Sequence, residues 1–396
     1  MNIGLFTDTY FPQISGVATS IKTLKNVLEA KGHSVYIFTT TDPKVDKDET
    51  EPNVFRFGSV PFVSFTDRRI AVRGLFHALE VAKELDLDIV HTQTEFSMGM
   101  IGKFVAKNLK IPCVHTYHTM YEDYLHYVLN GKLLKPAHVK QFTKMYLTHM
   151  TAVVAPSDRV LHTLKRYKIK IPISVIPTGI DLTRFSRPVS IDVRSQYGIG
   201  ARHLLLSLSR IGQEKKLDVL IKAMPQILAV CPDAYLLIVG DGPAREDLEA
   251  LVSEMGLQDF VGFAGEIDHE YVNDYYKSAD LFVSASDSET QGLTFDEALA
   301  AGVKCVVYSE PYVNKLFDDP SVGATFNTPG EMVAEISQYL LHPAAFNDEI
   351  IRRQKLNEIS ADTFGNRILD FYHNAQSIFV ASDDEPEEIS DKEFLK

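Results

Sequence analysis

The chain has 396 residues, 45% of them hydrophobic, and a formal net charge of −13. This length exceeds one ordinary hydrophobic core and predicts two globular domains, while the apolar content excludes an intrinsically disordered chain. The sequence contains no apolar run long enough to span a bilayer, so no transmembrane helix is expected. No basic segment precedes the first apolar residues, and no signal peptide is therefore expected.

The charge is distributed unevenly along the chain. Residues 1–190 contain 24 Lys and Arg against 17 Asp and Glu, whereas the remainder contains 16 against 36. The basic first half is expected to face an anionic surface, and the absence of DNA- or RNA-binding motifs argues against nucleic acid. The three cysteines, Cys113, Cys231 and Cys305, lie far apart and are expected to be buried thiols of a reducing cytoplasm.

In chain order, apolar runs alternate with helix-like segments. Strands are predicted in the first half at 2–7, 34–39, 88–92, 112–117, 152–155 and 174–176, with helices at 17–31, 70–85 and 98–109. After a linker at 177–188, further strands are predicted at 203–207, 234–239, 260–263, 280–284 and 304–307. Two final helices, at about 343–360 and 363–379, have no strand after them.

This alternation predicts an α/β protein with two Rossmann-like, doubly wound parallel-sheet domains that face a cleft. The expected divisions are a first domain at 1–185, which carries the basic excess, and a second domain at 186–360. A C-terminal helix at 361–381 is expected to cross back to the first domain. Residues 382–396 are acidic and poor in large apolar side chains, which is typical of a disordered tail.

Two glutamates, Glu289 and Glu297, lie eight positions apart between a predicted strand and a predicted helix. A glycine in this loop lets backbone N–H groups approach a phosphate, and the new helix N-terminus attracts that anion. The residues at this point are Gly292, Leu293 and Thr294. Glu289 is expected to face a sugar, and Glu297 to face ribose hydroxyls. Such spacing also occurs on solvated helix faces, so other loops must support the interpretation.

Three more strand-end loops of the second half carry suitable groups. Arg210 and Lys215 share a loop in which they are expected to bracket a diphosphate. Asp241 lies in a Gly-Asp-Gly-Pro turn, either as a ligand or as an N-cap. Backbone groups for a base are expected from Gly265, Glu266 and Ile267. Because these loops should meet at one edge of the sheet, they predict a nucleotide-sugar site.

In the first half, Gly16 opens the first helix at a strand end. A glycine there fits equally well the close approach of a ligand, such as the phosphate of a sugar donor or an acceptor, and a plain strand-to-helix turn. No GxGxxG fingerprint supports a dinucleotide. His118 follows the strand at 112–117 and is expected to project into the cleft, although a lone histidine is often structural. No histidine spacing supports a metal site, and Asp86 to Asp88 precedes its strand and is interpreted as a turn.

Aromatic and basic residues of the first half predict peripheral binding to an anionic leaflet, against the alternative of a solvated basic face. They are Phe62, Phe65, Arg68, Arg69, Arg73, Lys132, Lys135, Lys140 and Lys144. The expected location is therefore the cytoplasm, at the inner face of the cell membrane.

Taken together, these motifs resemble the family 4 glycosyltransferases of the GT-B fold over almost the whole chain. The resemblance implies transfer from a nucleotide diphospho-sugar with retention of configuration. It also implies Glu289 near the donor-sugar hydroxyls, Glu297 on the ribose and His118 near the transferred sugar. Arg210 and Lys215 match the family's diphosphate loop. No cofactor is expected to be obligatory, and Mg²⁺ is expected to stimulate at most.

Within that family, segments 6–13, 91–97 and 115–123 are similar to the diacylglycerol glucosyltransferases of Gram-positive bacteria. This implies a UDP-glucose donor, a diacylglycerol acceptor and an α-monoglucosyl lipid product. One alternative is a second-step enzyme that adds glucose or galactose to the monoglucosyl lipid, and more distant ones are a GT-B epimerase and a nucleotide-sugar sensor. Two departures are Ser15 before Gly16, where a glycine pair is common, and the sequence at 302–306.

Overall fold

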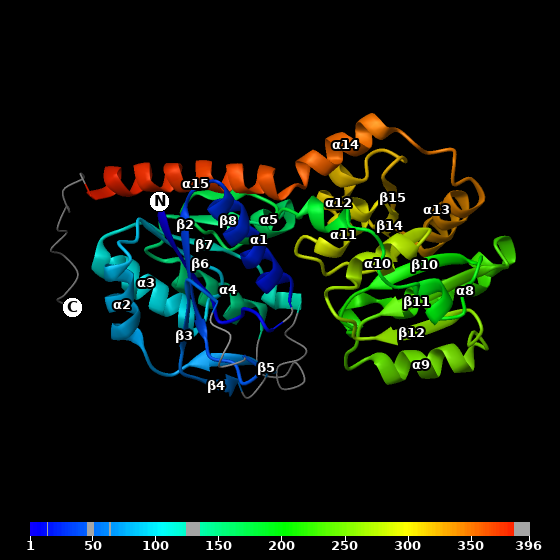
Figure 1. Cartoon of the computed structure of the whole chain (residues 1–396), viewed down its shortest axis with the longest axis horizontal. Coiled ribbons are helices and arrows are strands. Elements are labelled where there is room, and N and C mark those ends of the chain that lie inside the picture. Colours follow the sequence, from blue (N-terminus) through cyan, green and yellow to red (C-terminus); the bar gives the residue numbers. More distant parts are fainter. Residues whose placement is uncertain (14, 46–50, 63–64, 124–134, 384–396) are drawn as a thin grey trace.

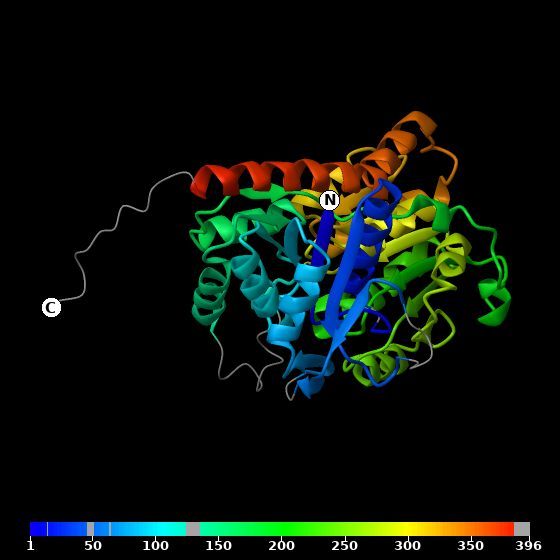
Figure 2. The same ribbon diagram turned by 60° about the vertical axis from the view of Figure 1, so that its left-hand side comes forward.

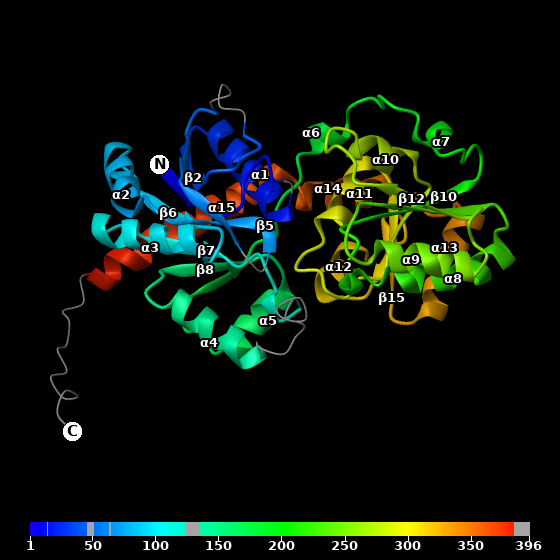
Figure 3. The same ribbon diagram turned by 90° about the horizontal axis from the view of Figure 1, so that it is seen from below.

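The computed structural model describes residues 1–13, 15–45, 51–62, 65–123 and 135–383. Two α/β domains lie side by side, and one long helix, α15 (Ala361–Asp383), runs along the N-terminal domain (Figure 1). The view from below separates the same two bodies, joined near α5 (Asp158–Arg166) and α12 (Pro311–Leu316) (Figure 3). The predicted two-domain α/β architecture is confirmed.

The N-terminal domain is built on a seven-stranded parallel sheet with the order β3-β2-β1-β6-β7-β8-β9. Its strands are β1 (Asn2–Phe6), β2 (Ser34–Thr40), β3 (Val54–Phe57), β6 (Ile89–Thr92), β7 (Cys113–Thr116), β8 (Ala152–Ala155) and β9 (Ile173–Val175). Its other helices are α1 (Gly16–Ala30), α2 (Leu75–Glu84), α3 (Ser97–Leu109) and α4 (Pro136–Leu147). Both faces are buried: Ile3 and Leu5 enter one core and Phe6 the other.

The C-terminal domain is built on a six-stranded parallel sheet with the order β12-β11-β10-β13-β14-β15. The strands are β10 (His203–Leu208), β11 (Ala234–Val239), β12 (Val261–Gly265), β13 (Leu281–Ser284), β14 (Lys304–Tyr308) and β15 (Gly323–Phe326). The helices are α6 (Leu182–Phe185), α7 (Val193–Gln196), α8 (Leu217–Val230), α9 (Arg245–Glu254), α10 (Val272–Ser278), α11 (Leu293–Ala301), α13 (Pro329–Leu341) and α14 (Glu349–Glu358). In β11, Leu236 and Leu237 face opposite cores.

The chain passes between the domains earlier than predicted. Ile176 packs in the N-terminal core, whereas Ile180 and Phe185 pack in the C-terminal core. Phe185 lies 6.2 Å from the ring of Tyr276, so α6 belongs to the C-terminal domain although the sequence placed the boundary after residue 185. The burial of Phe185 in the C-terminal core therefore places the domain boundary before α6.

Helix α15 returns to the N-terminal domain, as the sequence predicted. Figure 2 shows it lying along that domain above α1. Phe364, Ile368 and Tyr372 share a buried cluster with β1, and the Tyr372 hydroxyl lies 2.7 Å from Nδ1 of His91. The acidic tail predicted at 382–396 lies almost wholly outside the described residues.

The aromatic and basic segment after β3 forms a hairpin. β4 (Ser59–Phe62) pairs antiparallel with β5 (Phe65–Ala71), so the helix predicted from residue 70 begins only at Leu75. Gly74 precedes it with a φ of 109°, and a Cβ there would lie 2.5 Å from the ring of Phe57. Neither this hairpin nor β3 and β15 was predicted, because these short elements lack the long apolar runs of central strands.

The amide of Gln291 ties the interdomain linker to α11. Its Nε2 donates to the Thr178 carbonyl and to Asp296 Oδ2, both at 2.9 Å, and its Oε1 accepts from the Thr178 N–H at 2.8 Å. Thr178 also contacts Ser20 of α1 through their hydroxyls at 2.8 Å. All four side chains are buried. This amide clamp, comprising Ser20, Thr178, Gln291 and Asp296, therefore links both domains through one connected set of hydrogen bonds.

Asp296 is fully buried and also accepts a hydrogen bond from the Tyr312 hydroxyl at 2.8 Å. Burial raises the pKa of its carboxyl from 3.8 to about 7, against the opposing effect of the hydrogen bonds from Tyr312 and Gln291. Because its pKa is higher in the folded state, Asp296 binds more protons there than in the unfolded chain between pH about 4 and 7. Its contribution to stability therefore falls as the pH rises through that range.

We expect Asp296→Asn to reduce the loss of thermal stability between pH 5 and pH 8, because the amide is isosteric, neutral at every pH and able to bond both partners. Melting curves measured across that range for the wild type and the variant check this. Asp370→Asn, on the exposed side of α15, is the matched control. Parallel pH dependences for Asp296→Asn and the wild type would show that the buried carboxyl does not titrate as stated.

Candidate functional site

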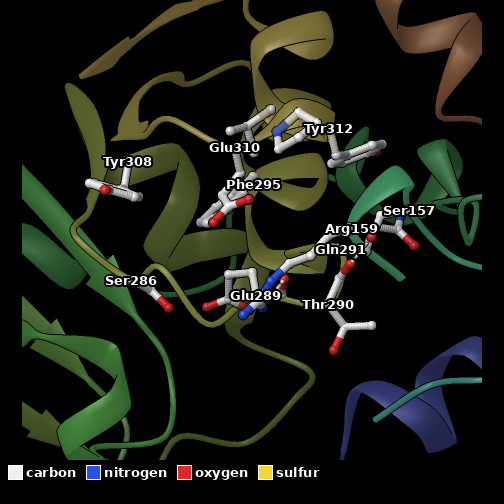
Figure 4. Close-up of a pocket in the computed structure, with 12 residues that line it drawn as sticks. Ser157, Arg159, Ser286, Glu289, Thr290, Gln291, Phe295, Tyr308, Glu310 and Tyr312 are labelled. Carbon is white, nitrogen blue, oxygen red and sulfur yellow. Dashed lines mark hydrogen bonds between the residues drawn. The ribbon is translucent and has the colours of Figure 1, made fainter. Parts of the chain in front are cut away.

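The site lies where loops from the two sheets meet. A small pocket is lined from the N-terminal domain by Ser157 and Arg159 and from the C-terminal domain by residues that include Glu289 and Gln291 (Figure 4). Arg159 donates to the Glu289 carbonyl at 3.0 Å, and the Ser157 hydroxyl donates to the Thr290 carbonyl. The donor loop, residues 285–292, is thus held by side chains of the opposite domain.

Glu289 and Lys215 are brought together as an ion pair. Lys215 Nζ donates to Glu289 Oε1 at 2.6 Å, and the two side chains are 14% and 19% exposed. Burial acts to raise the pKa of Glu289, but Lys215, Ser286 and Arg159 outweigh it and leave the pKa below its ordinary value. Glu289 is therefore an anion whose charge is already balanced, and Lys215 is fixed beside the loop that was predicted to face a sugar.

Arg210 is exposed on the loop after β10, and a glycine turn positions this loop. Gly240 and Gly242 pack directly on it, since a Cβ on them would lie 1.9 Å from the Ser209 carbonyl and 2.4 Å from the Ile211 carbonyl. Both have positive φ, of 127° and 157°. The Gly-Asp-Gly-Pro sequence is thus required for the close approach of two strand-end loops, one of which carries Arg210.

The side-chain hydrogen bonds of Asp241 are local to its own turn and the helix that follows. Its carboxylate accepts from the Gly242 N–H at 2.7 Å and from Arg245 at 3.1 Å. The N-cap of α9 is Ala244, without a side-chain capping bond, so Asp241 is not the N-cap that the sequence allowed. In the next loop, Gly265 has a φ of 75° and accepts from the Gly240 N–H at 2.8 Å, Glu266 is exposed, and Ile267 packs against the core.

The N-terminus of α11 faces that of α1 across the domain boundary. Gly292 caps α11 with a φ of 90°, and a Cβ there would lie 2.5 Å from the ring of Phe295. A Cβ on Gly16 would lie 3.6 Å from Leu293 Cδ1. Leu293 and Thr294 begin the helix, where N–H groups lack partners within the helix and favour an anion. Gly16 therefore permits the close approach of the two domains at this predicted phosphate position.

Glu297 lies one turn into α11 and is 8% exposed. Its Oε2 accepts from the Tyr276 hydroxyl at 2.9 Å. Burial raises the pKa of Glu297, while the nearby Arg184 guanidinium and the Tyr276 hydroxyl oppose that rise. Tyr276 and Arg184 therefore position the carboxylate that the sequence assigned to a ribose, and neither was predicted from the sequence.

His118 follows β7, on the N-terminal side of the site, and its Nε2 lies 2.7 Å from Gln93 Oε1. Burial and the neighbouring His115 lower the pKa of His118 to about 3. Its imidazole is therefore neutral at physiological pH. His118 is suited to hydrogen bonding with a neutral ligand group rather than to pairing with an anion.

The basic residues predicted for the membrane do not form one uniform set. Arg69 donates to the Ser59 side chain at 2.8 Å and to its carbonyl at 2.9 Å, so its guanidinium holds the β4–β5 hairpin together. Arg73, Lys135 and Lys144 are exposed, and Lys140 is half-buried. The side chains of Phe62, Phe65 and Arg68 and the whole of Lys132 lie outside the described part of the chain.

Among the described residues, no helix is both long and apolar enough to cross a bilayer. No group of three or more His, Cys, Asp or Glu side chains in the same residues is arranged to hold a metal ion. Sequence reasoning missed Arg159 and Gln291. The rule that ligands gather at strand ends applies to Arg159, which follows β8, whereas the contacts of Gln291 arise only from the domain arrangement.

Comparison with known proteins gives two matches along the chain. Residues 14–184 match the model "Glycosyltransferase Family 4", and residues 191–358 match "Glycosyl transferases group 1". The chain is 46% identical to the alpha-monoglucosyldiacylglycerol synthase of Streptococcus pneumoniae, over 95% of this chain and 86% of that protein. It is 34% identical to the synthase of the same name from Acholeplasma laidlawii, over 93% and 94% of the two chains.

Solved structures share the fold. HepE from Anabaena, in complex with UDP, superposes with a TM-score of 0.75 at 16% identity, covering 94% of this chain and all of that one. Sucrose-phosphate synthase from Thermosynechococcus elongatus superposes with a TM-score of 0.74 at 22% identity, covering 96% and 99%. The family matches, the full-length relatives and the two-domain GT-B architecture agree, and the chain belongs to glycosyltransferase family 4.

Proposed function

We propose that the protein transfers glucose from UDP-glucose to 1,2-diacylglycerol and so makes the α-monoglucosyldiacylglycerol of membrane glycolipid and lipoteichoic acid anchor synthesis. The observation that carries this proposal is the 46% identity, over 95% of the chain, to an alpha-monoglucosyldiacylglycerol synthase. The pairing of Glu289 with Lys215 in the loop expected to hold the sugar supports it. A GT-B epimerase and a sensor are disfavoured because full-length relatives in two organisms are named as synthases.

In the proposed mechanism, the acceptor hydroxyl attacks the anomeric carbon on the face from which UDP leaves, which retains the configuration. The bond from the anomeric carbon to the diphosphate oxygen breaks as the new glycosidic bond forms. The leaving oxygen takes the acceptor proton. Arg210, Lys215 and the N-terminus of α11 would stabilise the charge that develops on the diphosphate. Because these groups supply positive potential themselves, we propose that Mg²⁺ stimulates the reaction without being required.

We expect Arg210→Ala and Glu297→Ala each to lower kcat/KM by roughly a hundredfold or more, which is the scale for removing one preorganised charge partner. Initial rates measured with UDP-glucose and mixed micelles that contain diacylglycerol check this. Repeating the measurement with a chelator tests whether a metal ion is required. Lys222→Ala, on an exposed part of α8 in the same domain, is the matched control. Near-wild-type rates in either site variant would contradict the assignment of the diphosphate and ribose site.

We expect glucose transfer from UDP-glucose onto diacylglycerol, with an α-linked product and little transfer from UDP-galactose. A site that bonds each sugar hydroxyl discriminates strongly, because the wrong epimer leaves buried polar groups unpaired. Offering both donors with diacylglycerol and with monoglucosyldiacylglycerol, followed by mass and anomeric NMR analysis, checks this. Transfer only onto the preformed glycolipid would instead show the second-step enzyme, which adds glucose or galactose.

We also propose that the N-terminal domain binds the inner, anionic leaflet of the cell membrane peripherally. Two exposed cations have exposed apolar neighbours: Arg73 lies near Phe76, which is 70% exposed, and Lys144 adjoins Met145, which is 63% exposed. Cations beside apolar side chains suit a lipid interface. The proposal concerns Arg73, Lys144 and the exposed Lys135, and omits Arg69 because Ser59 engages it.

We expect the double variant Arg73→Gln, Lys144→Gln to bind anionic vesicles about thirtyfold more weakly, since each of the two cations near such a surface contributes about 1 kcal/mol. Its binding should also depend less on salt. Sedimentation with phosphatidylglycerol vesicles at several salt concentrations measures both effects. The matched control is Lys222→Gln, Arg353→Gln, which removes one Lys and one Arg from the C-terminal domain. An equal loss in both double variants would indicate a general charge effect rather than this docking surface.

A further inference from the structure

Gln93 and His118 lie just beyond the carboxyl ends of two neighbouring strands. Gln93 directly follows β6, His118 lies two residues beyond β7, and these parallel strands pair so that Thr92 is opposite His115. The carboxyl ends of the two strands therefore bring both side chains to the edge of the sheet that faces the donor loop. Gln93 is 2% exposed, and its Oε1 lies 2.7 Å from Nε2 of His118.

This contact determines the tautomer of His118. A carbonyl oxygen only accepts hydrogen bonds, so the ring nitrogen that faces it must carry a proton. With the ring neutral, Nδ1 then has no proton and presents a lone pair. Burial and His115 lower the pKa of His118 to about 3, which keeps the ring in this neutral form. His118 is thus a hydrogen-bond acceptor at Nδ1.

A second histidine, His115, contacts a carboxylate of the same loop instead of an amide. Glu95, two residues after Gln93, has its Oε1 3.2 Å from Nε2 of His115 and accepts a further hydrogen bond from Tyr121. In general, a carboxylate beside a histidine favours the imidazolium form, whereas an amide does not. Among the described residues, the titratable groups that act on His118 include His91 from β6 and His115 from β7, and Glu95 of the same loop as Gln93 is paired with His115. An amide at residue 93 is therefore the choice that leaves His118 uncharged.

Stability alone does not explain Gln93. Within the described part of the chain, its Nε2 is buried and has no hydrogen-bond partner. A buried donor without an acceptor destabilises a fold by about 1–3 kcal/mol. An apolar side chain of the same length would avoid this penalty. In this chain the amide oxygen contacts His118 while the amide nitrogen is unsatisfied, an arrangement that fits a functional role of the oxygen.

We propose that Gln93 is a positioning residue that holds His118 as the Nε2–H tautomer, so that Nδ1 accepts a hydrogen bond from a hydroxyl of the transferred hexose. This inference rests on the proposed function, because it takes the ligand of His118 to be a sugar. The hydrogen-bonding form of His118 would thus be set by a residue in the preceding strand-end loop. A carboxylate at residue 93 would stabilise the imidazolium, which has no lone pair and cannot accept the sugar hydroxyl.

The first test is the pH dependence of kcat for Gln93→Glu. We expect the wild type to lose little activity between pH 8 and pH 6, while the variant loses at least tenfold as its His118 gains a proton. UDP affinity should change by less than twofold, because the groups assigned to ribose and diphosphate are untouched. Gln258→Glu, which adds the same charge at an exposed position, is the matched control and should keep the wild-type profile. A Gln93→Glu profile parallel to that of the wild type would overturn the proposal.

The second test does not depend on transferase activity. In ¹⁵N-histidine-labelled wild-type protein, two-bond proton–nitrogen spectra should show His118, assigned with His118→Asn, as the Nε2–H tautomer from pH 6 to pH 8. An Nδ1–H tautomer or an imidazolium would overturn the proposal even if the enzyme makes the expected glycolipid. Conversely, the predicted tautomer in a protein with no activity on UDP-glucose and diacylglycerol would place the error in the substrate assignment.

A third variant separates positioning from folding. Gln93→Met removes the unpaired amide nitrogen and also the acceptor for His118, two effects on stability that oppose each other. We expect a melting temperature within a few degrees of the wild type and a kcat at least tenfold lower, with the KM for UDP-glucose changed much less. A variant that loses stability and activity together, with kcat restored wherever it is folded, would show that Gln93 is only structural.

Discussion

One buried amide connects the linker between the two domains to the helix that follows the 285–292 loop. Gln291 bonds both backbone groups of Thr178 in the linker and the carboxyl of Asp296 in α11. Because each of these groups is buried, removal of the amide would leave several of them unpaired, at about 1–3 kcal/mol for each. Gln291 lies two residues after Glu289 and directly before Gly292, the N-cap of α11. The orientation of the domains and the shape of the donor loop are therefore set by the same contacts.

This arrangement separates the roles of two adjacent carboxyl groups. Successive residues on a helix point in directions about 100° apart, so Asp296 faces the clamp while Glu297 faces Tyr276 and Arg184. Burial raises the pKa of Asp296 to about 7, so its protonated and ionised forms coexist near neutral pH. Burial also raises the pKa of Glu297, while the guanidinium of Arg184 opposes that rise. One turn of α11 thus carries both a carboxyl group that joins the domains and a carboxyl group in the position proposed for a ligand.

The sequence predicted most central strands and the loops that carry the site, because buried parallel strands are continuous apolar runs and ligand groups follow their carboxyl ends. It did not predict the β4–β5 hairpin, whose short strands include charged residues, or that Phe185 belongs to the C-terminal core. Asp241 shows a further limit, since one position after a strand suits both a ligand and a cap. Gln93, Arg159 and Gln291 were missed because their partners come from distant segments, and only the fold brings those partners near.

The ion pair of Glu289 and Lys215 shows how the donor site is prepared before a ligand arrives. Both side chains are mostly buried, and an isolated charge in such a place would be strongly disfavoured. If Lys215 moves toward a diphosphate, Glu289 needs replacement donors, and sugar hydroxyls in the same loop are suitable ones. A bound nucleotide without its sugar supplies none of them. On the proposed site assignment, diphosphate binding and sugar binding would thereby be coupled through one carboxylate, so that the charges meeting the leaving group are positioned when the complete donor is bound.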